Sequence, residues 1–248
     1  SAGATAAMAG LYTLTVTDNN GCQNTATTTV TVNPLPTATA SNNGPVCAGA
    51  LLSLTGGPDG MTTYAWTGPD GFSSALQSPA VSAGATAAMA GLYTLTVTDN
   101  NGCQNTANTT VTVNPLPTAT ASNNGPICAG ALLSLTGGPD GMTTYAWTGP
   151  DGFSSALQSP AVSAGATAAM AGLYTLTVTN SYGCQNTATT TVTVNALSNP
   201  TLTSSDTDNI FCAGTSVTFT AGDGTSYNFR VGGVSVQSGA SATYTTSS

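Results

Sequence analysis

Residues 92–98 read LYTLTVT, and this short stretch decides the fold class. Within it, Tyr93, Leu95 and Val97 alternate with three threonines. A period of two predicts a β-strand with one buried face, and β-branched threonine suits the face that meets water. The sequence then turns at DNNG and alternates again towards Val111. The two runs therefore predict a β-hairpin with one apolar side.

This hairpin lies inside an internal repeat with a period of 81 residues, because the same string begins at Ser1, Ser82 and Ser163. The third copy drifts after its first fifteen or so residues. The first two copies differ only at two positions, which are Thr27 against Asn108 and Val46 against Ile127. A fixed period of this length, with room for one core per repeat, predicts an array of small β-sandwiches.

The remainder of each repeat consists of short strands and turns. LLSLT and YAWTG carry strand patterns, GGPDG is a turn signal, and ATAAMAG is interpreted as a strand end and turn. The NPLP segment is the expected linker, because proline breaks a sheet ladder. We therefore expect residues 34–114 and 115–195 to be complete domains. Residues 1–33 would hold strands E to G of another domain, and residues 196–248 strands A to E of a diverged one. The predicted fold is all-β, with tandem Ig-like sandwiches in a head-to-tail array.

Charge is almost absent from this sequence. It has one arginine, no lysine and no histidine, and only 4% of its residues are charged, with a net charge of −8. Nothing basic is present to bind a phosphate backbone, so nucleic acid and anionic membranes are poor partners. No run approaches the ~20 apolar residues of a membrane helix, so no membrane insertion is expected. Aspartate is the only candidate base, which argues against an enzyme.

A weak candidate for a metal site lies near the C-terminus. Asp206, Asp208 and Asn209 belong to the sequence DTDN, which could be the start of a loop of oxygen ligands for calcium. The glycine turn and the closing glutamate of an EF-hand are absent. A surface loop is the simpler interpretation, and no other cofactor is expected.

Four aromatic residues are candidates for the sandwich core. Trp66 and Trp147 occupy the predicted strand C, where a tryptophan usually fills the core, although an exposed one could stack on sugars. Tyr93 and its counterpart Tyr174 begin the predicted strand F, which suggests a tyrosine corner.

The six cysteines contain no CxxC pair, which leaves zinc and thioredoxin chemistry unsupported. The start of strand B and the end of strand F lie at opposite poles of an Ig-like sandwich, which strains a bond within one domain. In a head-to-tail array, the AB cysteine of one domain meets the FG cysteine of its successor. We therefore expect Cys47–Cys184, with Cys47–Cys103 and Cys128–Cys184 as the alternative pairing.

A resemblance to a known family rests on the segment at residues 10–36, which reads GLYTLTVTDNNGCQNTATTTVTVNPLP, together with the CAG opening and the YAW strand. It resembles Ig-like and PKD-like repeats of long secreted surface proteins of the Bacteroidota, including gliding-motility adhesins exported by the type IX system. The resemblance implies a structural or adhesive stalk, or an extracellular filament, at the cell surface. Its partners would be its own neighbouring domains and filament chains, with a surface glycan or substratum also possible. A carbohydrate-binding accessory module of a secreted hydrolase is the alternative.

The two incomplete domains lead us to expect that residues 1–248 are a window onto a longer polypeptide. The alternative is a subunit in which residues 196–248 are completed by residues 1–33 of the next copy. Strand complementation of that kind would pair otherwise open sheet edges.

Overall fold

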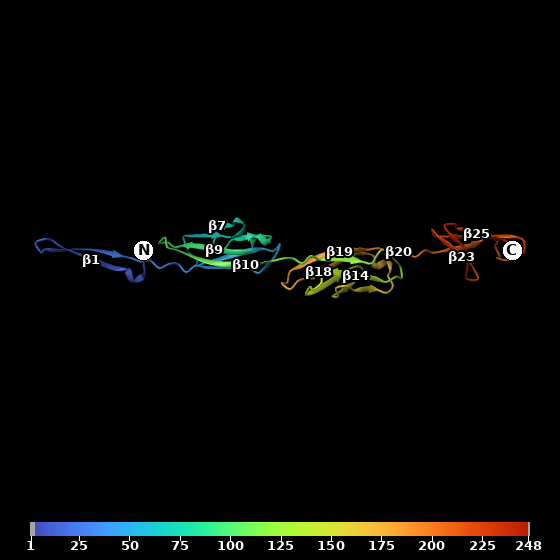
Figure 1. Ribbon diagram of the computed structural model, residues 1–248, viewed down its shortest axis with the longest axis horizontal. Coiled ribbons are helices and arrows are strands. Elements are labelled where there is room, and N and C mark those ends of the chain that lie inside the picture. The colour runs from blue at the N-terminus through green and yellow to red at the C-terminus, as the bar shows by residue number, and fades with distance from the viewer. Residues whose placement is uncertain (1–2, 248) are drawn as a thin grey trace. The chain divides into compact units, whose positions relative to one another are not determined.

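The structure is a computed structural model that describes residues 3–247 (Figure 1). Strands dominate, and the helical elements of the described residues are four 3₁₀ turns, which are η1 (Ala6–Met8), η2 (Pro69–Gly71), η3 (Ala87–Met89) and η4 (Ala168–Met170). The backbone forms two compact units. The first comprises Ser1–Thr118, Pro139–Thr144 and Val178–Asn186, and the second comprises Ala119–Gly138, Tyr145–Thr177 and Thr187–Ser248.

The N-terminal hairpin consists of β1 (Gly10–Thr17) and β2 (Gln23–Val30). These strands pair in antiparallel register, from Gly10 opposite Val30 to Thr17 opposite Gln23. Every residue of both strands is exposed. The predicted hairpin therefore forms here without a core beneath it.

The first sandwich, in residues 39–114, contains two antiparallel sheets. One sheet has the order β3 (Thr39–Asn42), β5 (Leu52–Gly57) and β8 (Ala80–Ser82). The other has the order β10 (Gln104–Val111), β9 (Gly91–Thr98), β6 (Thr63–Thr67) and β7 (Ser73–Ser74). A short strand β4 (Val46–Cys47) runs parallel to β11 (Val113–Asn114). In Ig nomenclature these sheets are A-B-E and C′-C-F-G, so the predicted Ig-like sandwich is confirmed.

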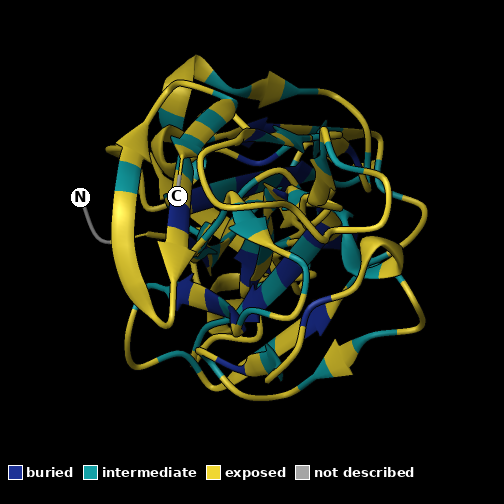
Figure 2. Ribbon diagram, turned by 90° about the vertical axis from the view of Figure 1, so that its right-hand side faces the viewer, coloured by how far each residue is buried: buried dark blue, intermediate teal, exposed yellow. Residues whose placement is uncertain are grey.

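The core of this sandwich follows the period of two. The side chains of Tyr93, Leu95 and Val97 are fully buried, while the residues between them on β9 are partly exposed. They pack with Leu54 of β5 and Trp66 of β6. Figure 2 shows such buried stretches as bands on the strands, with exposed backbone around them. Alternation along each strand thus places one face of each sheet in a shared core.

Local details of the first sandwich differ from the sequence expectation. ATAAMAG contains a 3₁₀ turn, η3, instead of a strand end and simple turn. Strands β7 and β8 are short, with two and three residues. Strand β4 was not predicted, because its partner β11 lies far along the chain and leaves no local pattern.

The second sandwich, in residues 120–195, has the same strand order. One sheet contains β12 (Thr120–Asn123), β14 (Leu133–Gly138) and β17 (Ala161–Ser163). The other contains β16 (Ser154–Ser155), β15 (Thr144–Thr148), β18 (Gly172–Thr179) and β19 (Gln185–Val192). The parallel pair is β13 (Ile127–Cys128) and β20 (Val194–Asn195). Near-identical repeat sequences therefore produce the same topology twice.

The C-terminal strand set, in residues 201–247, again has two layers. One sheet is β21 (Thr201–Ser204), β22 (Ser216–Gly222) and β25 (Thr243–Ser247). The other is the hairpin of β23 (Tyr227–Val231) and β24 (Val234–Gly239). Phe229 stacks on Tyr244 between the layers, with ring centroids 5.7 Å apart.

Candidate functional site

Cys47 lies on the short strand β4, which a parallel partner holds in place. Backbone hydrogen bonds on both sides of Cys47 attach it to β11 and the residue before it: Val46 N donates to Thr112 O at 3.1 Å, and Ala48 N donates to Asn114 O at 2.8 Å. The chain then turns, with Ala50 N donating to Cys47 O at 3.0 Å. These bonds fix the position of the Cys47 backbone at the end of the first sandwich's last strand.

Cys184 lies in the loop between β18 and β19, where the side chain of Asn180 organises the turn. Asn180 Oδ1 accepts hydrogen bonds from the backbone N–H groups of Tyr182 and Cys184, both at 3.0 Å. Asn180 N donates to Cys184 O at 3.0 Å, and Gly183 has a φ of +78°, which favours glycine. The sequence Asn-Ser-Tyr-Gly-Cys thus presents the thiol at a defined point of a closed turn.

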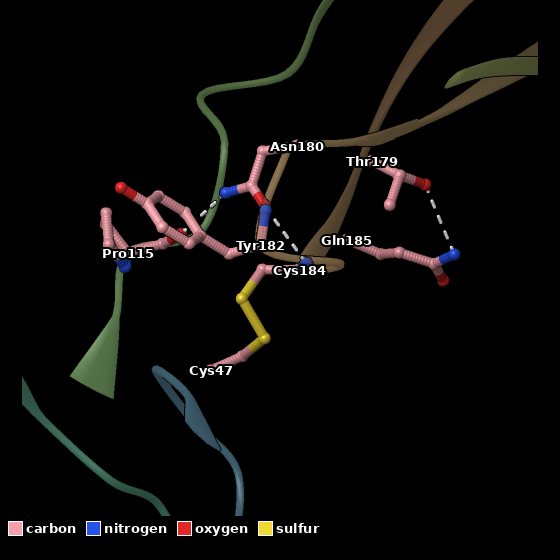
Figure 3. The surroundings of a disulfide bond; sticks show 7 residues. All are labelled: Cys47, Pro115, Thr179, Asn180, Tyr182, Cys184 and Gln185. Atoms are coloured by element: carbon pink, nitrogen blue, oxygen red, sulfur yellow. Dashed lines mark hydrogen bonds between the residues drawn. A yellow bond between two sulfur atoms is a disulfide. The ribbon is translucent and has the colours of Figure 1, made fainter. Parts of the chain in front are cut away.

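Cys47 and Cys184 form a disulfide bond, which Figure 3 shows with its surroundings. Their Cα atoms are 5.6 Å apart, inside the range that a disulfide requires. Cys184 is almost fully buried, with 1% of its surface exposed. The bond spans 137 residues of sequence and joins the two repeats within the first compact unit. This is the pairing expected from the head-to-tail topology.

The alternative pairing within each domain does not form. Cys103 precedes β10, whereas Cys47 pairs with β11 beyond the other end of β10. The eight residues of β10 span about 27 Å, far beyond disulfide reach. Cys22, Cys103, Cys128 and Cys212 are free thiols here.

Two asparagines hold the linker that precedes the second sandwich, and sequence reasoning did not find them. Asn180 Nδ2 donates to Pro115 O at 3.0 Å, and Asn186 Nδ2 donates to Pro117 O at 2.9 Å. Asn105 makes the same bond to Pro36 O at 2.9 Å, so this contact recurs with the repeat. Proline has no N–H of its own, but its carbonyl remains a free acceptor that an amide side chain satisfies.

The Asn180 contact distinguishes this turn from its copies. Asp18 and Asp99 occupy the same place in the earlier hairpins and accept the same pair of backbone hydrogen bonds. A carboxylate cannot donate to a proline carbonyl, whereas the Asn180 amide can. The change from TDNNGC to TNSYGC was visible in the sequence, but its partner was not. In the turn that contacts the linker, the neutral Asn180 amide therefore replaces the charged carboxylate of the earlier copies.

The predicted core aromatics are buried. Trp66 donates from Nε1 to Gln77 O at 3.1 Å, and Trp147 donates to Gln158 O at the same distance. Both indoles are 1% exposed, so neither can serve as a sugar-stacking surface.

Tyr93 and Tyr174 form the corner that was expected at the start of strand F. Tyr93 Oη donates to Met89 O at 2.9 Å, and Tyr174 Oη donates to Met170 O at 3.0 Å. Burial raises the pKa of both phenols, and Asp70 near Tyr93 and Asp151 near Tyr174 raise it further. The neutral phenol is therefore the form that these cores favour.

The loop proposed as a calcium site uses its aspartate side chains to accept hydrogen bonds from its own backbone. Asp208 N donates to Asp206 Oδ1 at 3.1 Å, and Ile210 N donates to Asp208 Oδ1 at 3.0 Å. A hydrogen bond with the Asp206 side chain, and then the one from Ile210 N, lower the pKa of the Asp208 carboxyl. Asn209 has a positive φ of 57°. Within residues 3–247, no three acidic, histidine or cysteine side chains gather in a way that could hold a metal ion.

Among the described residues, no helix is both long and apolar enough to cross a membrane. No family model matches the chain, and no curated protein matches it.

Solved structures similar to this chain include some whose descriptions name Ig domains. A chain from the complex of the mouse coronavirus receptor-binding domain with its murine receptor is 14% identical, with a TM-score of 0.37, and the match covers 65% of this chain and 100% of that one. Murine CEACAM1b is 13% identical with a TM-score of 0.34 and the same coverage. An amphioxus IgVJ-C2 molecule is 16% identical with a TM-score of 0.28, covering 59% and 97%. The Ig-like assignment made here rests on strand order and core, and not on these likenesses.

Proposed function

We propose that this chain is a load-bearing part of an extracellular stalk or surface filament. In this proposal residues 34–114 and 115–195 are successive Ig-like domains, and residues 1–33 and 196–248 belong to further domains of the same kind. The observation that carries the proposal is the Cys47–Cys184 bond, which ties one repeat covalently to the next. An enzyme or a free-standing binding module has no evident need for such a bond.

The chemistry of the chain suits an exposed location. A structural disulfide is stable in an oxidising compartment, which includes the outside of the cell. The sequence contains one arginine and no lysine, so trypsin-like proteases find almost no cleavage site. Together with the resemblance to Bacteroidota surface repeats, this supports export to the cell surface and a role in adhesion through the array.

The linker at Pro115–Pro117 is held by hydrogen bonds, so it should resist a pulling force better than a flexible linker would. The linker carbonyls of Pro115 and Pro117 accept hydrogen bonds from Asn180 and Asn186 within the same compact unit. Force applied along the backbone would therefore meet the disulfide and these amide contacts. The main partners are further copies of the repeat, with a glycan or substratum at a distant tip.

The carbohydrate-module hypothesis loses its main support. It relied on Trp66 or Trp147 as a stacking surface, and both side chains lie in sandwich cores. Sugar-binding aromatic residues must present a face to the ligand.

Single-molecule pulling on the full chain tests the mechanical part of the proposal. With the bond intact, the segment between Cys47 and Cys184 cannot extend, so full extension should be shorter by roughly 450–490 Å than after reduction. Cys47→Ser should behave like the reduced chain. Cys128→Ser, the same position in the next repeat, is the matched control and should not. Equal extension in oxidised and reduced chains would contradict the proposal.

Labelling of intact cells tests the biological part. Antibodies against residues 34–195 should decorate the outer surface of the source organism, and deletion of the gene should reduce attachment to surfaces. Restriction of the label to the cell interior would overturn the proposed function.

A further inference from the structure

An Asn-Gly pair occurs in two different local settings in this chain. Asn20 and Asn101 lie at the tips of hairpin turns, whereas Asn43 and Asn124 follow the first strand of each sandwich. At an Asn-Gly pair an asparagine side chain reacts readily with its own backbone, because glycine has no Cβ to hinder the approach of its nitrogen. Since the dipeptide is the same in both settings, the surrounding structure decides which asparagine reacts.

The side chain of Asn43 is held at both of its polar atoms. Its Nδ2 donates to Leu51 O, and its Oδ1 accepts from Ser53 N, both at 2.9 Å. Asn124 makes the same pair of bonds in the second sandwich, also at 2.9 Å. The Cγ atom of either residue cannot turn towards the following nitrogen until both bonds break.

The side chain of Asn101 is not held in this way. Its backbone N–H donates to Asp99 Oδ1 at 2.8 Å, but its side-chain amide has no hydrogen bond to any of residues 3–247. The following nitrogen, Gly102 N, donates to Asp99 O at 3.1 Å, and Gly44 N likewise donates to a side-chain oxygen at 2.7 Å. Both glycine nitrogens are therefore engaged, and the two settings differ in the asparagine side chain.

Solvent exposure does not separate the two settings, because Asn43 and Asn101 are both exposed. The tip of the turn also remains in water where the next domain of the array is present. In the turn that carries the disulfide, residues 181–183 are exposed although Cys184 is buried, and Tyr182, at the position of Asn101, is 64% exposed. The accessibility of Asn101 is therefore a property of the turn itself.

We infer that Asn101 is a site of spontaneous covalent modification, where asparagine converts through a cyclic imide into aspartate and isoaspartate. Asn43 and Asn124 are protected from the same reaction by their hydrogen bonds. Asn20 lies in a copy of the Asn101 turn and should react as Asn101 does. The inference depends on the chemistry of the turn and is independent of the proposed stalk function.

The reaction needs water as its only co-reactant. Gly102 N attacks Asn101 Cγ, a bond between these atoms forms, and the bond from Cγ to Nδ2 breaks. Ammonia leaves with the proton of Gly102 N, and a cyclic imide remains. Water then opens the ring. Opening at the side-chain carbonyl gives aspartate, and opening at the main-chain carbonyl gives isoaspartate, whose backbone passes through Cβ and Cγ.

Isoaspartate would disturb the turn that presents Cys103. That turn is closed by Asp99 N, which donates to Cys103 O at 3.0 Å, and by Cys103 N, which donates to Asp99 Oδ1 at 2.8 Å. An extra methylene group in the backbone, with a new negative charge beside Asp99, would break this geometry. The turn that forms the disulfide has Tyr182 before its glycine, so it lacks the reactive pair.

Incubation of the full chain in mildly alkaline buffer tests the inference. Samples are digested with pepsin at acid pH, and mass spectrometry measures the replacement of each amide by an acid. Asn108 marks the Asn101 peptide, and Val46 marks the Asn43 peptide. In the folded chain Asn101 should convert about tenfold faster than Asn43 or more, because two hydrogen bonds must first break at Asn43. Electron-transfer fragmentation should show isoaspartate at position 101.

The same incubation in denaturant is the control for the fold. Both asparagines precede glycine, so their conversion rates should become similar when the chain is unfolded. Equal rates in the folded chain, an unreactive Asn101, or a rate ratio that is the same in both states would each overturn the inference.

Two reciprocal substitutions move the site between turns. Asn101→Tyr copies the residue at position 182 and should abolish conversion in its own turn. Tyr182→Asn places an asparagine before Gly183 and should create a reactive site there, with a rate similar to that of Asn101. Both side chains are exposed, so neither substitution should affect folding. If position 182 does not react in Tyr182→Asn, the exposed tip of the turn does not determine the reaction, and the inference fails.

Discussion

The hairpins β1–β2 and β9–β10 have almost the same sequence and opposite surroundings. Leu14 is 62% exposed and its counterpart Leu95 is fully buried, while Tyr12 is 51% exposed and Tyr93 is fully buried. Both hairpins keep the same register and the same turn, and both tyrosines donate to the carbonyl of a methionine four residues earlier. Local sequence thus determines the hairpin, and only the other strands of the sandwich determine its burial.

This comparison separates two sources of stability. The hydrogen-bond ladder and the aspartate-capped turn are present in both hairpins. The apolar contact with β5 and β6 is present only in β9–β10. Because apolar burial is the dominant favourable contribution to folding, most substitution effects should appear in one hairpin and not in the other.

Replacement of Trp66 by alanine should have the largest effect. The indole fills the core of the first sandwich, so its loss should cost about 3–5 kcal/mol of unfolding free energy. Calorimetry should show this loss in the first sandwich, while Leu76→Ala, at an exposed position, should change little. A stable Trp66→Ala sandwich would contradict the assignment of this core.

The matched leucines should give the sharpest contrast. Leu95→Ala should cost about 2–5 kcal/mol, because it leaves a cavity among buried side chains. Leu14→Ala should change the stability of the single chain by less than about 0.5 kcal/mol, because that residue is already exposed. Denaturant titration of dilute, reduced chains would measure both. Similar costs would mean that the N-terminal hairpin has a core of its own.

Removal of the tyrosine hydroxyl should also cost more stability at Tyr93 than at its exposed counterpart Tyr12. Tyr93→Phe should cost about 1–3 kcal/mol, because Met89 O would lose its partner in a partly buried site. Tyr12→Phe should cost little, since water can replace the exposed bond.

The pH dependence at Tyr93 follows from its raised pKa. The folded state holds the phenol proton more tightly than the unfolded state, so stability should fall as the pH rises above 10 and through the raised pKa. Tyr93→Phe should reduce this alkaline loss, as measured by unfolding at a series of pH values. If the alkaline loss of stability is the same in Tyr93→Phe and in the unsubstituted chain, Tyr93 is not its source.

Asn180→Asp should have a smaller effect than the core substitutions. The carboxylate would keep the turn, as Asp99 does, but it would lose the donor to Pro115 O. We expect a cost of about 0.5–1.5 kcal/mol by thermal unfolding. Asp99→Asn is the control, and it should leave stability nearly unchanged. A neutral Asn180→Asp would show that the amide does not hold the linker.

The sequence was sufficient for much of the fold. The alternation at Tyr93, Leu95 and Val97 predicted the buried face of β9, and the period of 81 residues predicted repeated sandwiches. The cysteine pair followed from topology, because strand direction alone separates Cys47 from Cys103. These inferences worked because each depends on a pattern that is local or repeated.

Other features depend on contacts that no local pattern records. Strand β4 exists because β11 returns beside it, and the amide of Asn180 acts because Pro115 lies within reach. The exposure of Leu14 also could not be read from its own hairpin, which is nearly identical to a buried one. Long-range contacts decide all three.

Disulfide mapping of the native chain tests the central claim most directly. Thiols are blocked, the protein is digested without reduction, and linked peptides are sequenced by mass spectrometry. Val46 distinguishes the Cys47 peptide from its Ile127-containing copy, and Tyr182 marks the Cys184 peptide. The account predicts a linked peptide that contains Val46-Cys47 and Tyr182-Gly183-Cys184. A peptide that links Cys47 to Cys103 would contradict it.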